Sequence, residues 1–265
     1  HHLLPSGPHA SVRKVEQDAA VRALEKRCLW IVADWGLSSD EFVSSVLESR
    51  SMSTWPVYRL DLSEVPVSGD DLDQEIEAKL GLKIPQFSEE LAVAGEVVLL
   101  LDDITLGERP QGALPRELGL EYLAQAILDY CPSIVIVMRT RSDPANEEFG
   151  KVQIEALDEA DLKVYINRHI DGGKDLAVQE VVGQLLAITG GVPERVDRAL
   201  KALKVVTLSE LVASHQEEGE RQPSVGSQGL VRAIEELGSA THPTLQRALQ
   251  MLQALATFPH GAQFE

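Results

Sequence analysis

Apolar residues in the first part of the chain form short β-branched runs that alternate with stripes at helical spacing. The run at 28–33 ends abruptly at the turn sequence 34–36, and a helical stripe at 42–47 follows. The same alternation then repeats, so we predict a parallel sheet covered by helices, an α/β fold. Further strands are predicted at 57–62, 96–103, 133–138 and 151–154, and further helices at 12–27, 72–80 and 118–130.

The pattern changes near residue 158, where the β-branched runs stop and helical stripes follow up to residue 215. A polar segment with Gly, Pro and Ser then separates these stripes from two more helical stripes, so it is predicted to be a linker. The predicted domains are an α/β domain at 1–155, a helical lid subdomain at 156–215, a linker at 216–228 and a further region at 229–265.

The chain has 265 residues, of which 42 are acidic and 24 basic, so its formal net charge is -18. A field of this sign repels nucleic-acid backbones and anionic lipids. We therefore expect protein partners or self-association, with no nucleic-acid or membrane binding through this region. Cys28 and Cys131 lie beside apolar runs without ligand spacing, which favours buried thiols and a reducing cytoplasm. The histidines also lack the spacing of a metal site, and no metal is expected.

The turn after the first strand stands where a P-loop, G-x-x-x-x-G-K-[ST], would cradle phosphate. The matching stretch is Ala33-Asp34-Trp35-Gly36-Leu37-Ser38-Ser39-Asp40. Gly36 occupies a position that is commonly glycine. Ser38 replaces the last Gly, Ser39 replaces the Lys, and Asp40 replaces the magnesium-binding hydroxyl residue. An incoming phosphate would meet carboxylates instead of Lys, so we predict a degenerate loop.

Two other features of this loop concern how it is closed. Ser38 and Glu41 have the S-x-x-E spacing of a capping box, so the helix is predicted to cap itself. Trp35 is predicted to plug the phosphate pocket, although such a residue more commonly anchors a turn. The alternative interpretation of the whole loop is a helix N-terminus that binds no ligand.

Two later strands end in side chains of the kind that P-loop ATPases place near the terminal phosphate. Asp102 and Asp103 follow the apolar run 99–101, as do the Walker B acids that hold magnesium. The alternative is the solvated start of a loop. The next strand ends in Arg139-Thr140-Arg141, and we predict Arg141 as the residue that senses phosphate. An arginine exposed at the sheet edge is the alternative there.

Two motifs follow in the second half of the chain, Gly190-Gly191-Val192-Pro193 and Ala256-Thr257-Phe258-Pro259. With the loop and strands before them, they resemble in order and spacing the STAND and NB-ARC-like P-loop NTPases over nearly the whole chain. The resemblance implies a P-loop NTPase parallel sheet flanked by helices, then a small helical subdomain and the start of a winged-helix domain. It also implies that Pro193 lies near the adenine and that the chain comes from a longer protein.

The missing Lys and hydroxyl favour a STAND-like pseudo-NTPase module, which serves as a regulatory or assembly scaffold in a larger signalling, regulatory or defence protein. No catalytic residue and no bound cofactor are predicted. One alternative is a slow switch ATPase that retains ATP or ADP with Mg and controls oligomerisation, and another is the regulatory core of a transcription factor. The predicted vestigial nucleotide site comprises Gly36, Ser38, Ser39, Asp40, Asp102, Asp103, Arg141 and Pro193.

Overall fold

The computed structural model describes residues 4, 7–62, 72–103, 115–146 and 149–221. The chain divides into two compact units, residues 1–212 and residues 213–265. The predicted winged-helix region at 229–265 lies outside the described residues. Helix α9 (Leu208–Arg221) continues past residue 215, where the linker was predicted to begin.

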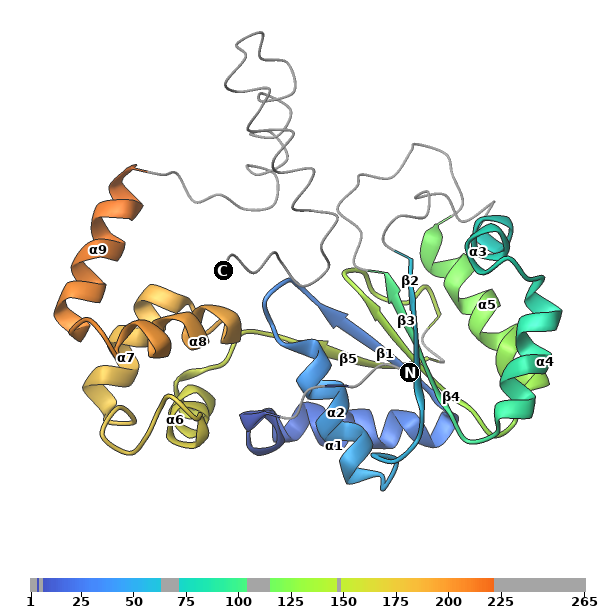
Figure 1. Ribbon diagram of the computed structural model, residues 1–265, viewed down its shortest axis with the longest axis horizontal. Coiled ribbons are helices and arrows are strands. Elements are labelled where there is room, and N and C mark those ends of the chain that lie inside the picture. Colours follow the sequence, from blue (N-terminus) through green and yellow to red (C-terminus); the bar gives the residue numbers. More distant parts are fainter. Residues whose placement is uncertain (1–3, 5–6, 63–71, 104–114, 147–148, 222–265) are drawn as a thin grey trace, which may run out of the picture. The chain divides into compact units, whose positions relative to one another are not determined.

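A five-stranded parallel sheet forms the centre of the first unit, with the strand order β2-β3-β4-β1-β5 (Figure 1). The predicted parallel sheet flanked by helices is therefore confirmed. Because β1 pairs with β4, and β4 with β3, the loop after β1 emerges at the same sheet edge as the carboxyl ends of those strands. The strands are β1 (Cys28–Ala33), β2 (Val57–Asp61), β3 (Val98–Asp103), β4 (Val135–Thr140) and β5 (Gly150–Ile154).

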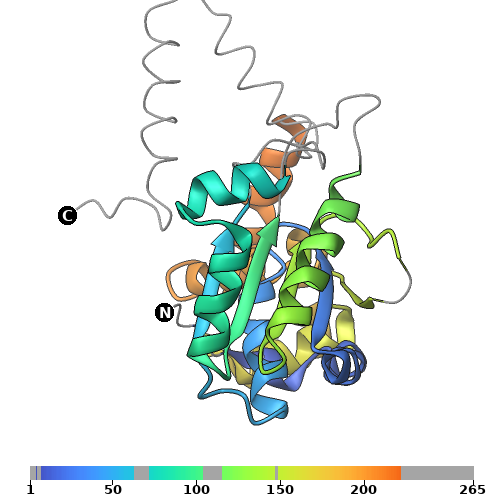
Figure 2. The same cartoon turned by 90° about the vertical axis from the view of Figure 1, so that its right-hand side faces the viewer.

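Helices cover both faces of this sheet, as the two views in Figures 1 and 2 show. On β1, Trp30 packs into a core with residues of α3, α4 and α5, whereas Leu29 and Ile31 pack with α1 and α2. Successive strand residues point to opposite faces, so the two apolar cores use alternate positions of the same strands. The covering elements are α1 (Lys14–Ala23), η2 (Leu24–Lys26), α2 (Ser39–Ser49), α3 (Leu72–Leu80), α4 (Ile84–Ala94) and α5 (Arg116–Tyr130).

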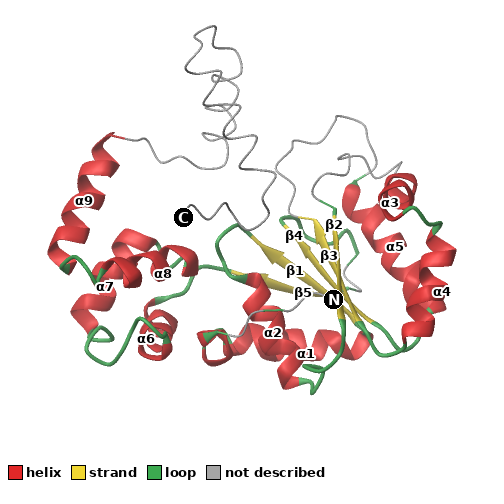
Figure 3. Cartoon of the chain, in the orientation of Figure 1, coloured by secondary structure: helices red, strands yellow, loops and turns green. Residues whose placement is uncertain are grey.

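Three helices after β5 share an apolar core of their own, and we refer to these three helices as the lid (Figure 3). This core also contains Val12, which belongs to the segment before α1 that includes the short helix η1 (Pro8–Ser11). The turn before the last lid helix requires glycine, because Gly191 has a φ of +70° and a Cβ there would lie 2.1 Å from the carbonyl oxygen of Leu157. The lid helices are α6 (Glu159–Arg168), α7 (Gln179–Thr189) and α8 (Pro193–Ala202).

The two cysteines and the length of the helices bear on the environment of the chain. Cys28 and Cys131 are free thiols and both are buried. Burial raises the pKa of Cys28 to about 12 and also raises that of Cys131, so neither thiol is poised to react. No helix within the described residues is long and apolar enough to cross a membrane.

Candidate functional site

The loop between β1 and α2 turns at two residues in the left-handed region. Gly36 has a φ of +79° and Ser38 a φ of +54°, with Leu37 buried between them. Helix α2 begins at Ser39, but Ser38 makes no side-chain capping hydrogen bond, so the predicted capping box is wrong. A capping serine normally has an extended backbone that aims its hydroxyl at the first turn, and left-handed Ser38 does not. Trp35 is 53 % exposed, so its predicted role as a plug is also wrong.

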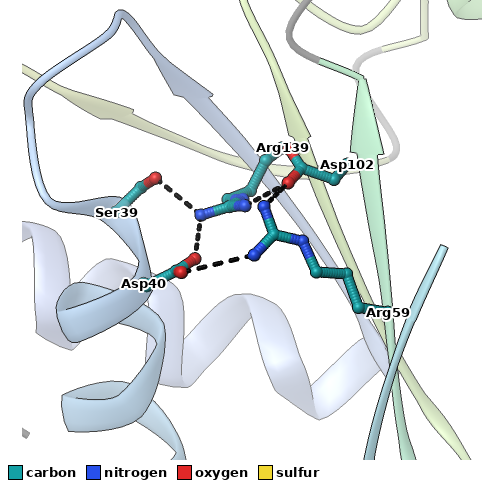
Figure 4. A network of polar contacts seen from close by, with 5 residues as sticks. All are labelled: Ser39, Asp40, Arg59, Asp102 and Arg139. Atoms are coloured by element: carbon teal, nitrogen blue, oxygen red, sulfur yellow. Dashed lines mark hydrogen bonds and ion pairs between the residues drawn. The ribbon is translucent and has the colours of Figure 1, made fainter. Parts of the chain in front are cut away.

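A charge network lies between the start of α2 and the ends of β3 and β4 (Figure 4). Arg139 from β4 is 3 % exposed, and its guanidinium donates to the hydroxyl of Ser39 at 2.9 Å. The same guanidinium binds the carboxylates of Asp40 and Asp102. Arg59 from β2 binds the same oxygen of Asp102 and lies 3.4 Å from the carboxylate of Asp40. Each aspartate of the network therefore contacts both arginines.

The register of the parallel strands brings these charges together. Asp102 lies directly opposite Arg139 on β4 and opposite Asp61 on β2. Arg59 precedes Asp61 by two positions, so its side chain leaves the sheet on the same face. Asp40 approaches from the first turn of α2, which follows β1 at the same edge of the sheet. Residues far apart in the sequence thus meet where a P-loop fold would place the phosphates and the metal ion.

The second acid at the end of β3 is bound by a different arginine. Asp103 is 6 % exposed, and Nε of Arg116 donates to its Oδ2 at 2.8 Å. Nη2 of Arg116 lies 2.7 Å from the other carboxylate oxygen and also donates to the carbonyl oxygen of Leu62 at 2.7 Å. Both predicted Walker B acids are therefore held by arginine side chains of the same chain.

The lid contacts the loop beside this network. The backbone N–H of Glu194 donates to the carbonyl oxygen of Gly36 at 3.2 Å. A Cβ on Gly36 would lie 3.0 Å from a methyl group of Val192, so glycine is needed both for the positive φ and for this close approach. Pro193 is buried as the first residue of α8. Gly36 thus contacts the residues on either side of Pro193, and this contact between loop and lid lies outside the charge network.

The electrostatics of the network are those of a neutralised site. Two guanidinium groups balance Asp40 and Asp102, at the positions where a working P-loop site offers a hydroxyl and an acid to magnesium. Close by, burial raises the pKa of Glu41, and the charges of Asp40, Asp197 and Glu194 raise it further. A phosphate entering this region would find the guanidinium groups already paired with carboxylates and would find no P-loop lysine.

Arg141, the residue predicted to sense phosphate, follows Arg139 by two positions and makes a different contact. Arg141 does not join the network; it lies 3.2 Å from Asp34, and its side chain is 30 % exposed. The residues that reasoning missed are Arg139 and Arg59. A signal for Arg139 was present, because a charged residue inside an apolar strand must find an opposite charge, and Asp102 ends the preceding strand. Arg59 gave no such signal, because its strand is exposed at three of its five positions and a charge there needs no partner.

No protein-family profile and no curated protein matches the chain. Among solved structures, DnaA of Aquifex aeolicus with AMPPCP bound is similar with a TM-score of 0.52 and 15 % identity, over 94 % of this chain and 81 % of that chain. A Walker-type ATPase of Pyrococcus abyssi is similar with a TM-score of 0.46 and 13 % identity, over 85 % of this chain and 78 % of that chain.

A STAND protein of Pyrococcus horikoshii with a tetratricopeptide repeat sensor is similar with a TM-score of 0.44 and 14 % identity, over 79 % of this chain. The chain spans 33 % of the length of that protein. At these identities the similarity concerns the fold, and it agrees with the parallel sheet and its covering helices. The fold of this chain is a parallel sheet flanked by helices, as expected for a P-loop NTPase fold, and it is similar to that of DnaA.

Proposed function

We propose that this chain is a STAND-like pseudo-NTPase module, a regulatory or assembly scaffold in which an internal charge network stands in place of bound nucleotide. The observation that carries the proposal is the pairing of Asp102 with both Arg59 and Arg139. Asp102 is the next-to-last residue of β3, the strand that would supply the magnesium-binding acid, and its charge is already balanced within the protein.

The loop residues favour the same interpretation. Ser39 and Asp40 stand where a working loop has its Lys and its hydroxyl residue, and both contact Arg139. A nucleotide would need Asp102 to exchange the buried guanidinium of Arg139 and the partly exposed guanidinium of Arg59 for a metal ion. Breaking one buried ion pair of this kind costs about 3–5 kcal/mol, which nucleotide binding would have to supply. We therefore infer that the resting site binds no nucleotide.

The partners of such a scaffold are other proteins or further copies of itself. A net charge of -18 opposes binding to nucleic acid and to anionic membranes. Two free, buried thiols are compatible with a reducing compartment such as the cytoplasm. Larger domains of a signalling, regulatory or defence protein would supply the trigger and the output.

Calorimetry and thermal unfolding with Mg–ATP and Mg–ADP test this proposal on the purified chain. A ligand present at 100 times its Kd stabilises a protein by about 2.7 kcal/mol, so binding at millimolar nucleotide would be plain. We expect no binding heat, no shift in Tm and no ATP turnover. Turnover that Asp102→Ala abolishes would overturn the proposal.

A matched set of variants tests the role of the network directly. Ser39→Lys with Asp40→Thr rebuilds the loop chemistry but leaves both arginines next to Asp102, so we expect little gain in nucleotide affinity. Adding Arg59→Gln and Arg139→Gln removes those internal cations, and we expect Mg–ADP binding to appear or to strengthen. If the loop change alone restores tight binding, the arginines do not block the site.

The alternative is a slow switch ATPase that retains ATP or ADP with Mg and controls oligomerisation. The similarity in fold to DnaA, which was solved with AMPPCP bound, is the observation that favours it. ADP that copurifies with the chain, together with a nucleotide-dependent change in oligomeric state, would support this alternative. Light scattering on the same preparation, with and without nucleotide, separates the two functions.

A further inference from the structure

The N-terminal lead, residues 8–13, lies against both the core and the lid. Its Val12 is 0 % exposed and forms part of the apolar core of the lid. Ser11 accepts a hydrogen bond from the guanidinium of Arg168 on α6. The ring of His9 packs edge-on against that of Tyr165, another residue of α6, with the ring centroids 5.2 Å apart. The lead thus supplies side chains to the lid, although it precedes the first strand in the sequence.

Arg13, the last residue of the lead, joins three parts of the first unit. Its Nη1 donates to the carbonyl oxygen of Leu37 in the β1–α2 loop at 2.9 Å. Its Nη2 donates to the carbonyl oxygen of Glu155, just before the lid, at 2.7 Å. Its backbone N–H donates to a carboxylate oxygen of Asp161 on α6 at 3.3 Å. Arg13 therefore links the β1–α2 loop to the residue that follows β5 and to the first helix of the lid.

The lead also carries features that weaken its own attachment. Arg13 has a φ of 54°, a backbone conformation that residues with a Cβ adopt at a cost. His9 is 1 % exposed, and within the described ranges neither of its ring nitrogens has a hydrogen-bond partner. A buried imidazole without partners gains hydrogen bonds to water when the segment detaches. The attachment is therefore extensive, but backbone strain at Arg13 and the desolvation of His9 oppose it.

We propose that residues 8–13 are a releasable clamp that holds the lid against the β1–α2 loop without a nucleotide, an inference that rests on the proposed function for its claim that the site is empty. In this arrangement Arg13 and Val12 make the bridge between core and lid that a bound nucleotide would otherwise make. Detaching the lead frees the lid to move relative to the loop.

Spin-label distance measurements on the whole chain test the clamp. Val93 on α4 and Arg198 on α8 are exposed, so Val93→Cys and Arg198→Cys offer label sites, while the native Cys28 and Cys131 are buried. With the native lead we expect one narrow distance distribution. Arg13→Met is expected to raise the open population about tenfold, the equivalent of about 1.4 kcal/mol of closing free energy.

The matched control is Lys14→Met, the same change at the exposed neighbouring residue, which should leave the distribution narrow. Circular dichroism reports whether each variant folds. Should Arg13→Met fail to fold, Val12→Ala, which only trims the apolar contact with the lid, decides the question. A narrow distribution in every folded lead variant overturns the clamp. A change in the distance between the labels when Mg–ADP is added to the chain with its native lead would contradict the proposed function instead. The lead variants would still decide whether the lead is a clamp.

Discussion

Arg139 and Arg13 are both buried in the first unit, and their surroundings satisfy the two charges differently. In the charge network Arg139 is 3 % exposed and binds two carboxylates. In the N-terminal lead Arg13 is equally buried, but its guanidinium donates to the neutral carbonyl oxygens of Leu37 and Glu155. Burial lowers the pKa of Arg13 to about 10. A buried charge that meets opposite charges fixes a site, whereas one held by neutral dipoles forms a weaker contact that can open.

The largest effect on stability is expected for Asp102→Ala, which tests how firmly the charge network is fixed. The change leaves the guanidinium groups of Arg59 and Arg139 next to each other with one of their two shared carboxylates removed, because Asp40 remains. Removing one partner of a buried ion pair destabilises a protein by about 3–5 kcal/mol, and we expect a loss in that range. Urea unfolding of the whole chain, followed by circular dichroism, measures the free energy of unfolding.

Asp143→Ala is the matched control for that experiment. Asp143 pairs with Lys151 at 2.8 Å, but its side chain is 62 % exposed, so its removal should change the free energy of unfolding by less than about 1 kcal/mol. If Asp102 instead awaited a metal ion, Asp102→Ala would relieve repulsion between acids and leave stability unchanged or higher. Such a result would remove the basis for the charge network as a substitute for nucleotide.

The second prediction concerns the pH dependence of the lead. Burial, and then the charge of Arg13, lower the pKa of His9 from 6.5 to about 3. Below pH 6.5 the unfolded chain therefore binds a proton that the folded chain does not, and stability falls as the pH falls towards 3. At pH 5 the loss is about 2 kcal/mol relative to pH 8, from about 1.4 kcal/mol per pH unit.

Unfolding curves of the native chain and of His9→Leu at the two pH values measure this contribution. Leucine removes the titrating group and the unpaired nitrogens, so the variant should be about 2 kcal/mol less sensitive to acid than the native chain. His215→Leu replaces an exposed histidine and serves as the control. If the native chain and His9→Leu lose the same stability on acidification, the pKa of His9 is the same in the folded and in the unfolded chain. The buried imidazole would then not weaken the lead in the way we infer.

The sheet could be predicted from the sequence because it depends on local alternation, which the chain carries at each strand. Helix α4 was not predicted, because Gly81 and Pro85 on either side of its start look like loop residues. Proline is nevertheless well tolerated in the first turn of a helix, where its missing N–H needs no partner, and α4 begins in that way.

The site was predicted less completely, because its contacts depend on strand order and register. The sequence places Asp40 and Asp102 at the ends of elements that a P-loop fold brings together, and they do meet. It does not say that β2 lies beside β3, and only that neighbour brings Arg59 within reach of Asp102. Ser38 shows a different limit, because its spacing to Glu41 fits a capping box while its left-handed backbone prevents one.

The smallest effect is expected for Arg141→Met, and its value lies in the contrast with Arg139→Met. Arg139 lies inside β4, where its charge is enclosed by Asp40 and Asp102, whereas Arg141 follows the strand and pairs at 3.2 Å with Asp34, whose side chain is 65 % exposed. Water and salt screen the exposed pair, so Arg141→Met should change the free energy of unfolding by less than about 1 kcal/mol, and less still in high salt. Arg139→Met should lose about 3–5 kcal/mol by urea unfolding at either salt concentration, because a buried pair is screened much less. Equal effects for the two arginines would mean that the charge at the end of β4 is not enclosed, and the distinction between a fixed network and an exposed pair would fail.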